Sequence, residues 1–380
     1  MEINKNNTLH ATPLSGDSAM RFIIAGGGTG GHIFPAIAIA NAIREMMPDA
    51  QFLFVGARGK MEMEKVPKAG YNITGLDIAG FNRASLLKNI SLPYKLVLSF
   101  LQVRTIFKRF KPTAVIGVGG YSSFPVLRFA QSKGIKTFIH ESNSFAGKSN
   151  RLLGKNATKI FVATPGMEKF FPASKLVVSG NPIRSSIAGN GIGQKEAAAF
   201  FGLSEHRKTI LAVGGSLGAA TINEALLAGL NEFAANDLQL IWQTGKNNSA
   251  KYTTAAAGKK NIWVSEFIQE MEYAYAAADL VVSRSGAMSV AEIAAVAKPA
   301  VLVPYPFAAE DHQTANAMQL VNAGAAMMVK DSAAAATLVQ TVIGLALNEA
   351  EQQLLITNIK PFGRVDADKI IAGEILKLIV

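Results

Sequence analysis

The feature that most constrains this chain is a unit of buried strand, glycine-rich turn and helix that occurs twice. The first unit is a strand at 21–25, a turn at 26–31 (GGGTGG) and a helix at 33–47 that Pro48 stops. The second is a strand at 209–213, a turn at 214–218 (GGSLG) and a helix from Ala219. Short β-rich runs and helical patterns alternate after each unit, which is typical of parallel sheets covered by helices. The sequence therefore predicts an α/β fold with two similar halves.

The other predicted strands divide between these halves at 51–55, 114–116, 137–140, 159–162 and 176–178, then 238–243, 261–264, 279–282 and 300–303. A Gly-rich break without periodicity begins at 186, so we expect a linker at 186–207 between an N-terminal domain (20–185) and a C-terminal domain (208–365). The length of 380 residues also fits two domains. Residues 366–380 predict a terminal helix that can pack back on the first domain. Residues 1–19 are polar and predict a disordered extension, not a signal peptide.

Composition excludes several kinds of site. The chain has no cysteine, so disulfides and thiolate metal sites are excluded. No apolar run approaches the roughly 18 residues that would span a bilayer. Asp366 and Asp368 have the D-x-D spacing of a metal site, but we interpret them as the start of a helix. We expect no metal and no cofactor.

The net charge of +11 is concentrated in one segment. Between Asp77 and Glu141 there is no acidic residue, but there are ten basic ones, Arg83, Lys88, Lys95, Arg104, Lys108, Arg109, Lys111, Arg128, Lys133 and Lys136. Pro93 and Pro112 bracket a predicted helix here, and apolar residues around 86–92 are hard to bury in a short connection. A basic and apolar surface suits an anionic membrane. Nucleic acid is the rival partner, but no DNA- or RNA-binding motif accompanies the charge.

A third turn carries a stronger signal. In SRSGAMSVAEI (283–293) a buried strand at 279–282 leads into a tight turn at 284–286, and Ala287 opens a helix that bears Glu292. Unpaired N–H groups at a helix N-terminus favour a phosphate or pyrophosphate, and Glu292 could accept hydrogen bonds from sugar hydroxyls. These features suit a nucleoside diphosphate. The alternative is an ordinary strand-to-helix turn with a solvated glutamate.

The first glycine turn allows two interpretations. Gly26, Gly28 and Gly31 have the G-x-G-x-x-G spacing of a dinucleotide site, but no acid follows the second strand to bind a ribose. Arg58 could meet a 2′-phosphate, so an NADP oxidoreductase stays open. Alternatively, the glycine turns of both halves face each other across a cleft at the carboxyl ends of the strands. His32 would then project into that cleft as a general base, or it would merely cap the turn.

Six motifs together resemble the ordered motif set of the MurG family. They are GGGTGGHIFPAIAIA (26–40), GVGGYSSFP (117–125), HESNSFAGKSNR (140–151), GNPIR (180–184), GGSLGA (214–219) and SRSGAMSVAEIA (283–294). The resemblance runs from about Met20 to the C-terminus. It implies a GT-B glycosyltransferase, with two Rossmann-like domains, that transfers N-acetylglucosamine from UDP-N-acetylglucosamine to lipid I to form lipid II in peptidoglycan synthesis. It implies a peripheral protein on the cytoplasmic face of the bacterial inner membrane, with cell-wall synthesis proteins as plausible neighbours.

The resemblance also implies site residues. Thr29, Gly30, Gly31, Asn143, Arg184 and Ser216 would contact the donor, Ile268 would meet the uracil, and Gln313 would bind sugar hydroxyls. Diphosphate and ribose would be held by Ala287, Met288, Ser289, Val290, Ala291 and Glu292. His32 would accept a proton from the 4-hydroxyl of the acceptor in a metal-free inverting displacement. His140, Glu141 and Tyr121 are candidate acceptor contacts.

The chain departs from the family pattern at Leu217, where many relatives carry glutamine, so side-chain contacts from that position are in doubt. The roles of Glu310 and Asp311 stay open. Two competing functions also remain: a UDP-N-acetylglucosamine 2-epimerase, which shares donor and fold, and a non-catalytic membrane scaffold.

Overall fold

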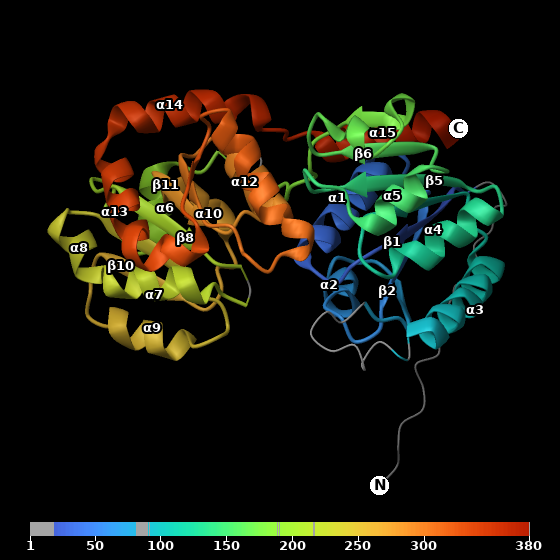
Figure 1. Cartoon of the computed structure of the whole chain (residues 1–380), viewed down its shortest axis with the longest axis horizontal. Helices are drawn as coiled ribbons and strands as arrows, with labels where there is room; N and C mark the ends of the chain where they lie inside the picture. Colours follow the sequence, from blue (N-terminus) through green and yellow to red (C-terminus); the bar gives the residue numbers. More distant parts are fainter. Residues whose placement is uncertain are drawn as a thin grey trace, which may run out of the picture.

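The structure is a computed structural model that describes residues 19–80, 90, 92–187, 189, 191–215 and 217–379. These residues form two α/β domains, each built on one parallel sheet with buried clusters on both faces (Figure 1). The α/β prediction is therefore confirmed. The extension predicted at 1–19 lies outside the described residues except for its last position.

The N-terminal sheet has the strand order β3-β2-β1-β4-β5-β6-β7. Its strands are β1 (Arg21–Ala25), β2 (Gln51–Ala57), β3 (Ile73–Leu76), β4 (Ala114–Gly117), β5 (Lys136–Glu141), β6 (Lys159–Val162) and β7 (Leu176–Val178). Its helices are α1 (Gly30–Met46), α2 (Glu62–Lys68), α3 (Leu92–Phe110), α4 (Ser123–Ser132) and α5 (Lys148–Gly154), with short 3₁₀ turns η2 (Met167–Lys169) and η3 (Ala173–Lys175). Chain order reverses between β1 and β4, so the turns after these two strands lie together at one edge of the sheet.

The C-terminal sheet has the order β10-β9-β8-β11-β12-β13 and reverses between β8 and β11. Its strands are β8 (Thr209–Val213), β9 (Gln239–Gln243), β10 (Ile262–Ser265), β11 (Leu280–Ser283), β12 (Ala300–Leu302) and β13 (Met327–Met328). The helices are α6 (Gln194–Phe200), α7 (Ala220–Ala228), α8 (Leu230–Ala235), α9 (Ser249–Ala256), α10 (Met271–Ala277), α11 (Ala287–Ala295), α12 (His312–Asn322), α13 (Ala334–Leu347) and α14 (Glu349–Ile359), with η4 (Ala309–Asp311), η5 (Asp331–Ala333) and η6 (Lys360–Phe362). Both turns singled out in this half therefore follow strands at its point of reversal.

All strands predicted from the sequence are present, with ends shifted by two residues or fewer. The edge strands β3 and β13 were not predicted, because they are short and only partly buried and so lack a clear apolar pattern. Helix α1 begins at Gly30, earlier than the expected 33, and it contains Pro35 in its second turn, where proline has no N–H group to donate.

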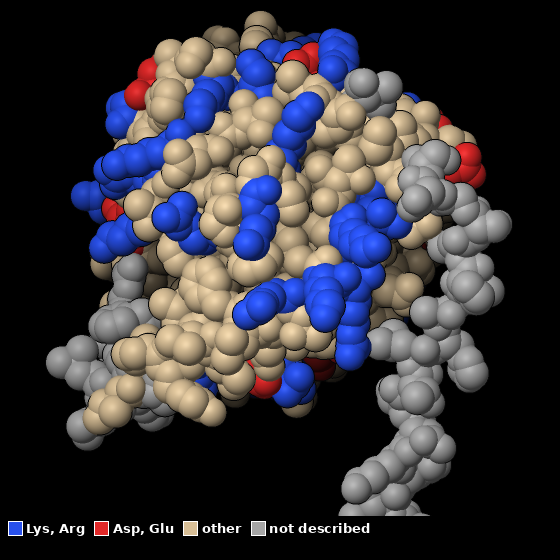
Figure 2. All heavy atoms as spheres, turned by 90° about the vertical axis from the view of Figure 1, so that its right-hand side faces the viewer, with Lys and Arg blue, Asp and Glu red and all other residues tan. Residues whose placement is uncertain are grey.

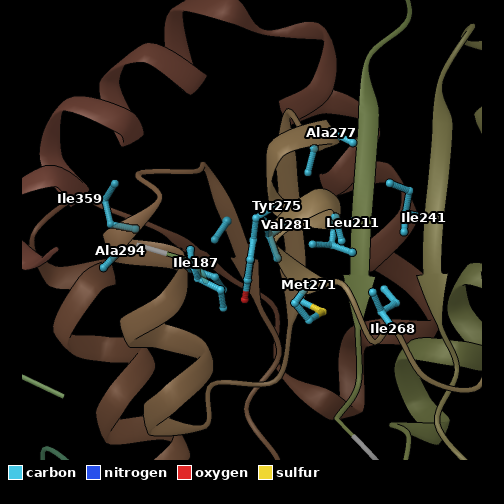
Figure 3. Close-up of a cluster of buried hydrophobic side chains, with 14 of the residues drawn as sticks. Ile187, Leu211, Ile241, Ile268, Met271, Tyr275, Ala277, Val281, Ala294 and Ile359 are labelled. Carbon is cyan, nitrogen blue, oxygen red and sulfur yellow. The ribbon is translucent and has the colours of Figure 1, made fainter. Parts of the chain in front are cut away.

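The region expected to be a linker, 186–207, is a linker only in part. Helix α6 forms within it, and Ala197, Ala198 and Phe201 are buried in the core of the C-terminal domain. Figure 3 shows this core, in which Ile187 lies among side chains such as Leu211 and Tyr275. The glycines at the start of the region favoured the prediction of a linker. The short helix that follows them was not predicted, because its burial depends on distant residues.

The chain returns to the N-terminal domain at its end. After α14 and η6 it crosses over the top of the molecule and forms α15 (Ala367–Ile379), which lies beside α1 (Figure 1). Ile371, Ala372 and Ile375 are buried in one cluster with residues of β1 and α1. The expected terminal helix therefore completes the core of the first domain.

Among the described residues, no single helix has the length and apolar character needed to cross a membrane. The consecutive segments 331–347 and 349–379, bent by 92° relative to each other, meet that test only as a pair. Both segments contribute buried side chains, Leu338 and Val342 in one domain and Ile371 and Ile375 in the other.

Shortening a buried side chain of α15 should destabilise the N-terminal domain. Ile371 is completely buried, so Ile371→Ala removes packed methyl groups and leaves a cavity; we expect a loss of about 2–5 kcal/mol in the free energy of unfolding. Denaturant unfolding followed by circular dichroism measures this loss. Leu354→Ala on the exposed side of α14 is the control and should change stability by less than about 0.5 kcal/mol. Equal effects from both variants would contradict the packing of α15.

Candidate active site

The turn after β1 uses its own N–H groups inside the protein. Residues 26–28 have φ of +152°, +148° and +89°, a region that favours glycine. Their N–H groups donate to the backbone of β2, to Gly119 O and to Glu62 Oε2, over 3.1, 3.3 and 2.8 Å. A pyrophosphate placed against these three residues would meet the Glu62 carboxylate and no free N–H group. This geometry argues against a dinucleotide site there, and Arg58 is itself paired with Asp77 at 2.8 Å.

His32 lies on the first turn of α1, between the two glycine turns of the N-terminal domain. Its Nδ1 is 3.0 Å from Gly27 O, so Nδ1 carries the proton and Nε2 keeps a lone pair. A Cβ at Gly119 would lie 2.8 Å from Nε2, so this glycine leaves room beside it. Burial lowers the pKa of His32 from its ordinary 6.5, against the opposing effects of the Gly27 bond and the Glu141 charge. The neutral imidazole can accept a proton at Nε2.

Thr29, Gly30 and Gly31 form the start of the same helix. Thr29 occupies the N-cap position in an extended conformation, and its Oγ1 is 3.5 Å from His32 Nδ1. Gly30 and Gly31 present their N–H groups at the N-terminus of a helix of 17 residues, which favours a negative charge in front of it.

His140 and Glu141 are buried, so the structure does not support direct contact with an acceptor. Burial lowers the pKa of His140 to about 4. The Glu141 carboxylate accepts hydrogen bonds from Asn143 N and Nδ2, Gly147 N and Asn150 Nδ2, at 2.9–3.3 Å. Its observed contacts are thus structural: it fixes the loop that carries Asn143. Local sequence gave no signal of that burial. Tyr121, by contrast, is 55% exposed.

Asn316 on α12 joins this loop to the C-terminal domain. Its Nδ2 donates to Ser285 O and Asn143 Oδ1 at 3.2 and 3.3 Å, and its Oδ1 accepts from Ser144 N at 3.0 Å. Ser144 Oγ also donates to Gln319 at 2.7 Å. Sequence reasoning missed Asn316, because an asparagine inside a helical pattern gives no sign of its partners. The expected donor contact Asn143 and the 284–286 turn are therefore held together.

The start of α11 has the geometry expected of an anion site. Gly286 is its extended N-cap residue, and Val290 N already donates to Gly286 O. The N–H groups of 287–289 are those that precede the helical hydrogen bonds. Ala287, Val290 and Ala291 also line a cavity of about 200 Å³ beside the interdomain connection. The contacts of 287–292 with diphosphate and ribose stay a prediction, to which the structure adds the N–H groups of 287–289.

Arg184 and Glu292 pair with each other across the domain boundary. Arg184 Nε and Nη2 donate to the two carboxylate oxygens at 3.2 and 3.3 Å, and Tyr275 OH donates to Oε2 at 3.2 Å. The guanidinium also lies 5.8 Å from the ring centre of Phe34 on α1. Burial and the Glu292 charge raise the pKa of Tyr275 well above 10, so its hydroxyl stays a donor. Both predicted ligand residues are present and pre-oriented by each other.

Arg284 holds the loop after β12 in place. The Arg284 guanidinium donates to Val303 O, Pro304 O and Asp331 Oδ1 at 3.1, 3.2 and 2.5 Å. Gln313 Oε1 accepts from Tyr305 N at 3.0 Å, so its amide nitrogen is the end that remains for a sugar hydroxyl. Glu310 and Asp311 precede α12 with φ of +56° and +53°, backbone strain that is often found at binding sites.

Ile268 and Ser216 are two further predicted donor contacts. The Ile268 side chain is 1% exposed in the core of the C-terminal domain, and its N–H donates to Gln243 Oε1 at 3.0 Å. The Ile268 side chain is thus covered and cannot reach a uracil in this structure. Its carbonyl oxygen takes no part in the hydrogen bond to Gln243. Ser216 lies outside the described residues. Leu217, in the same turn, is 68% exposed.

No group of three or more metal-ligating side chains occurs in the part of the chain that the structure describes. Asp366 and Asp368 stand at the start of α15, as predicted, and Ile370 N donates to Asp366 O.

Comparison with known proteins identifies the family. Models of the glycosyltransferase family 28 N-terminal and C-terminal domains match residues 22–162 and 209–369. A relative in Phocaeicola vulgatus is 50% identical over 94% of this chain and 96% of its own length. It is named UDP-N-acetylglucosamine--N-acetylmuramyl-(pentapeptide) pyrophosphoryl-undecaprenol N-acetylglucosamine transferase, as is a Cytophaga hutchinsonii relative at 46% identity over 94% and 97%. The chain belongs to the MurG family.

Solved structures agree with this assignment. The crystal structure of Acinetobacter baumannii MurG has a TM-score of 0.76 and 29% identity, over 94% of this chain and 99% of that one. A UDP-GlcNAc 2-epimerase from Neisseria meningitidis shares only the fold, with a TM-score of 0.68, 16% identity and coverage of 94% and 100%. The two domains of this MurG-family chain thus have the GT-B architecture.

Titration of the half-buried His32 and the buried His140 tests the site electrostatics. We expect His32 to titrate below pH 6.5 and His140 at about pH 4, since burial disfavours the charged ring in both. Above its pKa, His32 should carry its proton on Nδ1. NMR of ¹⁵N-histidine-labelled protein measures both properties. A His32 pKa above 6.5, or a proton on Nε2 in the neutral ring, would contradict the geometry.

Proposed function

We propose that this chain transfers N-acetylglucosamine from UDP-N-acetylglucosamine to N-acetylmuramyl-pentapeptide pyrophosphoryl-undecaprenol, the reaction that forms lipid II from lipid I. The observation that carries this proposal is similarity at 50% identity, over 94% of this chain, to relatives named for that activity. The site contributes a neutral histidine on one wall and a helix N-terminus on the other. His32 follows the carboxyl end of β1, and this helix follows the carboxyl end of β11.

The C-terminal domain holds the donor in this proposal. The N–H groups of 287–289 bind the diphosphate, and the α11 dipole adds roughly half a positive charge there. Glu292 accepts hydrogen bonds from the ribose hydroxyls. Arg184, which lies beside Glu292, contacts the donor from the same side. The Ile268 carbonyl meets the uracil, and the Gln313 amide donates to the sugar. Ser216 is a further donor contact in this proposal.

The acceptor approaches from the N-terminal domain, beside Thr29, Gly30 and Gly31, which contact the donor. The oxygen of its 4-hydroxyl attacks the anomeric carbon, and the bond from that carbon to the phosphate oxygen breaks. The hydroxyl proton goes to His32 Nε2, and UDP leaves with the electron pair. Attack opposite the leaving group converts the α-linked donor into a β-1,4 product.

Charge separation is the step that this site stabilises. Negative charge grows on UDP in front of α11, where fixed backbone dipoles need no reorganisation. The positive imidazolium forms near the buried Glu141 and Glu62 carboxylates, which stabilise it.

An exposed side of α3 supports docking on an anionic inner-leaflet surface. Tyr94, Val97 and Leu101 are 70%, 61% and 56% exposed, and Arg104 and Lys108 continue the same helical spacing. Gln102 hydrogen-bonds Asp77 just beyond β3, so the apolar part of α3 projects past the sheet edge that bears the glycine turns.

Basic side chains surround this side of the domain. Figure 2 shows Lys and Arg spread over the face while Asp and Glu lie mainly near its outline. A hollow of about 450 Å³ is lined by Phe107 and Phe129 and by four basic residues, Arg104, Lys108, Lys111 and Lys133. Each cation near an anionic lipid surface contributes about 1 kcal/mol. This supports peripheral attachment beside the lipid-linked acceptor.

The transfer itself is tested with radiolabelled donor. Label from UDP-N-acetylglucosamine should appear in butanol-extractable lipid when lipid I is supplied. His32→Ala should lower turnover about 10²- to 10⁴-fold, because a general base contributes that range. Donor affinity by calorimetry should be unchanged, since His32 is not among the proposed donor contacts. Label that stays in a sugar nucleotide would instead indicate an epimerase.

Membrane docking is tested with vesicles of phosphatidylglycerol and phosphatidylethanolamine. Val97→Glu with Leu101→Glu should weaken binding at least about tenfold, because it places two charges on the apolar side of α3. Leu354→Glu is the matched control, since that leucine is 53% exposed on the other domain. Undiminished binding by the double variant would exclude α3 as the docking surface.

A further inference from the structure

Glu62 is a buried acid whose hydrogen bonds have no part yet in the proposed reaction. It is the first residue of α2 and is 1% exposed. Its two carboxylate oxygens accept separate hydrogen bonds, Oε2 from Gly28 N at 2.8 Å and Oε1 from Ala57 N at 2.9 Å. No cation of the described residues forms an ion pair with it. This carboxylate therefore ties the glycine turn to the end of β2.

Two glycines make room for that carboxylate. A Cβ at Gly27 would lie 2.3 Å from Glu62 Cδ, and a Cβ at Gly56 would lie 2.5 Å from Glu62 Cγ. Gly27 also adopts a φ of +148°, so its peptide is held where few other residues could follow. The turn and the acid fit each other at contact distance.

The same peptide orients the histidine. Gly27 O accepts the hydrogen bond from His32 Nδ1 at 3.0 Å, while Gly27 N donates to Gly119 O at 3.3 Å. A Cβ at Gly120 would lie 2.5 Å from Gly27 O. The Gly27 peptide is thus enclosed by Glu62 on one side and by the turn after β4 on the other.

We propose that Glu62 is a positioning residue for the transfer: by anchoring residues 26–28 it keeps Gly27 O in place to bind His32 Nδ1–H, which leaves Nε2 to take the acceptor proton. This proposal rests on the proposed role of His32 as the base. Glu62 does not touch the substrate; it acts through the histidine.

A charge effect accompanies the geometric one. Glu141 and Glu62 raise the pKa of His32, whereas His312 lowers it and His140 lies close enough to interact with it. Glu62→Gln removes one of the two favourable charges and turns one acceptor oxygen into an amide donor that faces a backbone N–H. The pKa of His32 should then fall, so the acid limb of the kcat/KM profile should move to lower pH. A residue that served only folding would not move this limb.

The experiment compares Glu62→Gln with Glu64→Gln in the full-length protein. Glu64 lies on the same helix but is 62% exposed and pairs with Lys68, so it is the matched control. For Glu62→Gln we expect kcat to fall at least about tenfold, donor affinity by calorimetry to stay within about twofold, and the acid limb to shift downward. Glu64→Gln should match the parent protein. Glu62→Asp, which keeps the charge but shortens the reach, should lower kcat without the shift.

The double variant Glu62→Gln with His32→Ala decides whether the two residues act together. If Glu62 acts through His32, kcat in the double variant should equal that of His32→Ala alone. An equal loss from Glu62→Gln in both backgrounds, or a parent-like kcat for Glu62→Gln, would overturn the proposal.

NMR separates this proposal from the role of His32. If His32→Ala left turnover unchanged, the base assignment would fail, and with it the catalytic part of this inference. Loss of the Nδ1–H tautomer in ¹⁵N-labelled Glu62→Gln would still support the positioning contact. An unchanged tautomer and pKa of His32 in Glu62→Gln would overturn it whatever the base.

Discussion

Backbone N–H groups at the carboxyl ends of parallel strands are the resource on which this site depends. At the two points where chain order reverses, turns come together, and the hydrogen bonds decide which amides remain for a ligand. The N–H groups of residues 26–28 are used internally, on Val55, Gly119 and Glu62. The start of α1 leaves those of Gly30 and Gly31 outside the helical pattern, and the start of α11 does the same for 287–289. One turn thus gives a rigid support for a base, and two helix starts offer amides to a ligand.

Local features of the sequence were enough to predict the strands other than β3 and β13, the three turns and the start of α11 at Ala287. Gly26 to Gly31, Pro48 and the SRSG segment act within a few residues, so their consequences are visible without a fold. The motif set then predicted the GT-B architecture and the reaction. The edge strands β3 and β13 escaped because they are short and half-buried.

What the sequence could not predict depends on partners far along the chain. Glu62 lies 34 residues from the amide it binds, and Asn316 lies 172 residues from Ser144. The burial of the His140, Glu141 and Ile268 side chains likewise follows from packing with distant residues, which their motif positions did not indicate. A glycine opposite each carboxylate contact, as at Gly27 and Gly56, is the one signal that could have led to Glu62.

The return of α15 to the first domain makes that domain discontinuous in sequence. Its sheet is complete by β7, but the apolar side of α1 that Ile371 and Ile375 cover is not closed until residues 367–379 have been made. During synthesis, the whole C-terminal domain emerges from the ribosome while that patch is still open to solvent. Hydrophobic surface exposed for so long is prone to wrong association. The nascent chain therefore has a built-in interval in which a chaperone would be most useful.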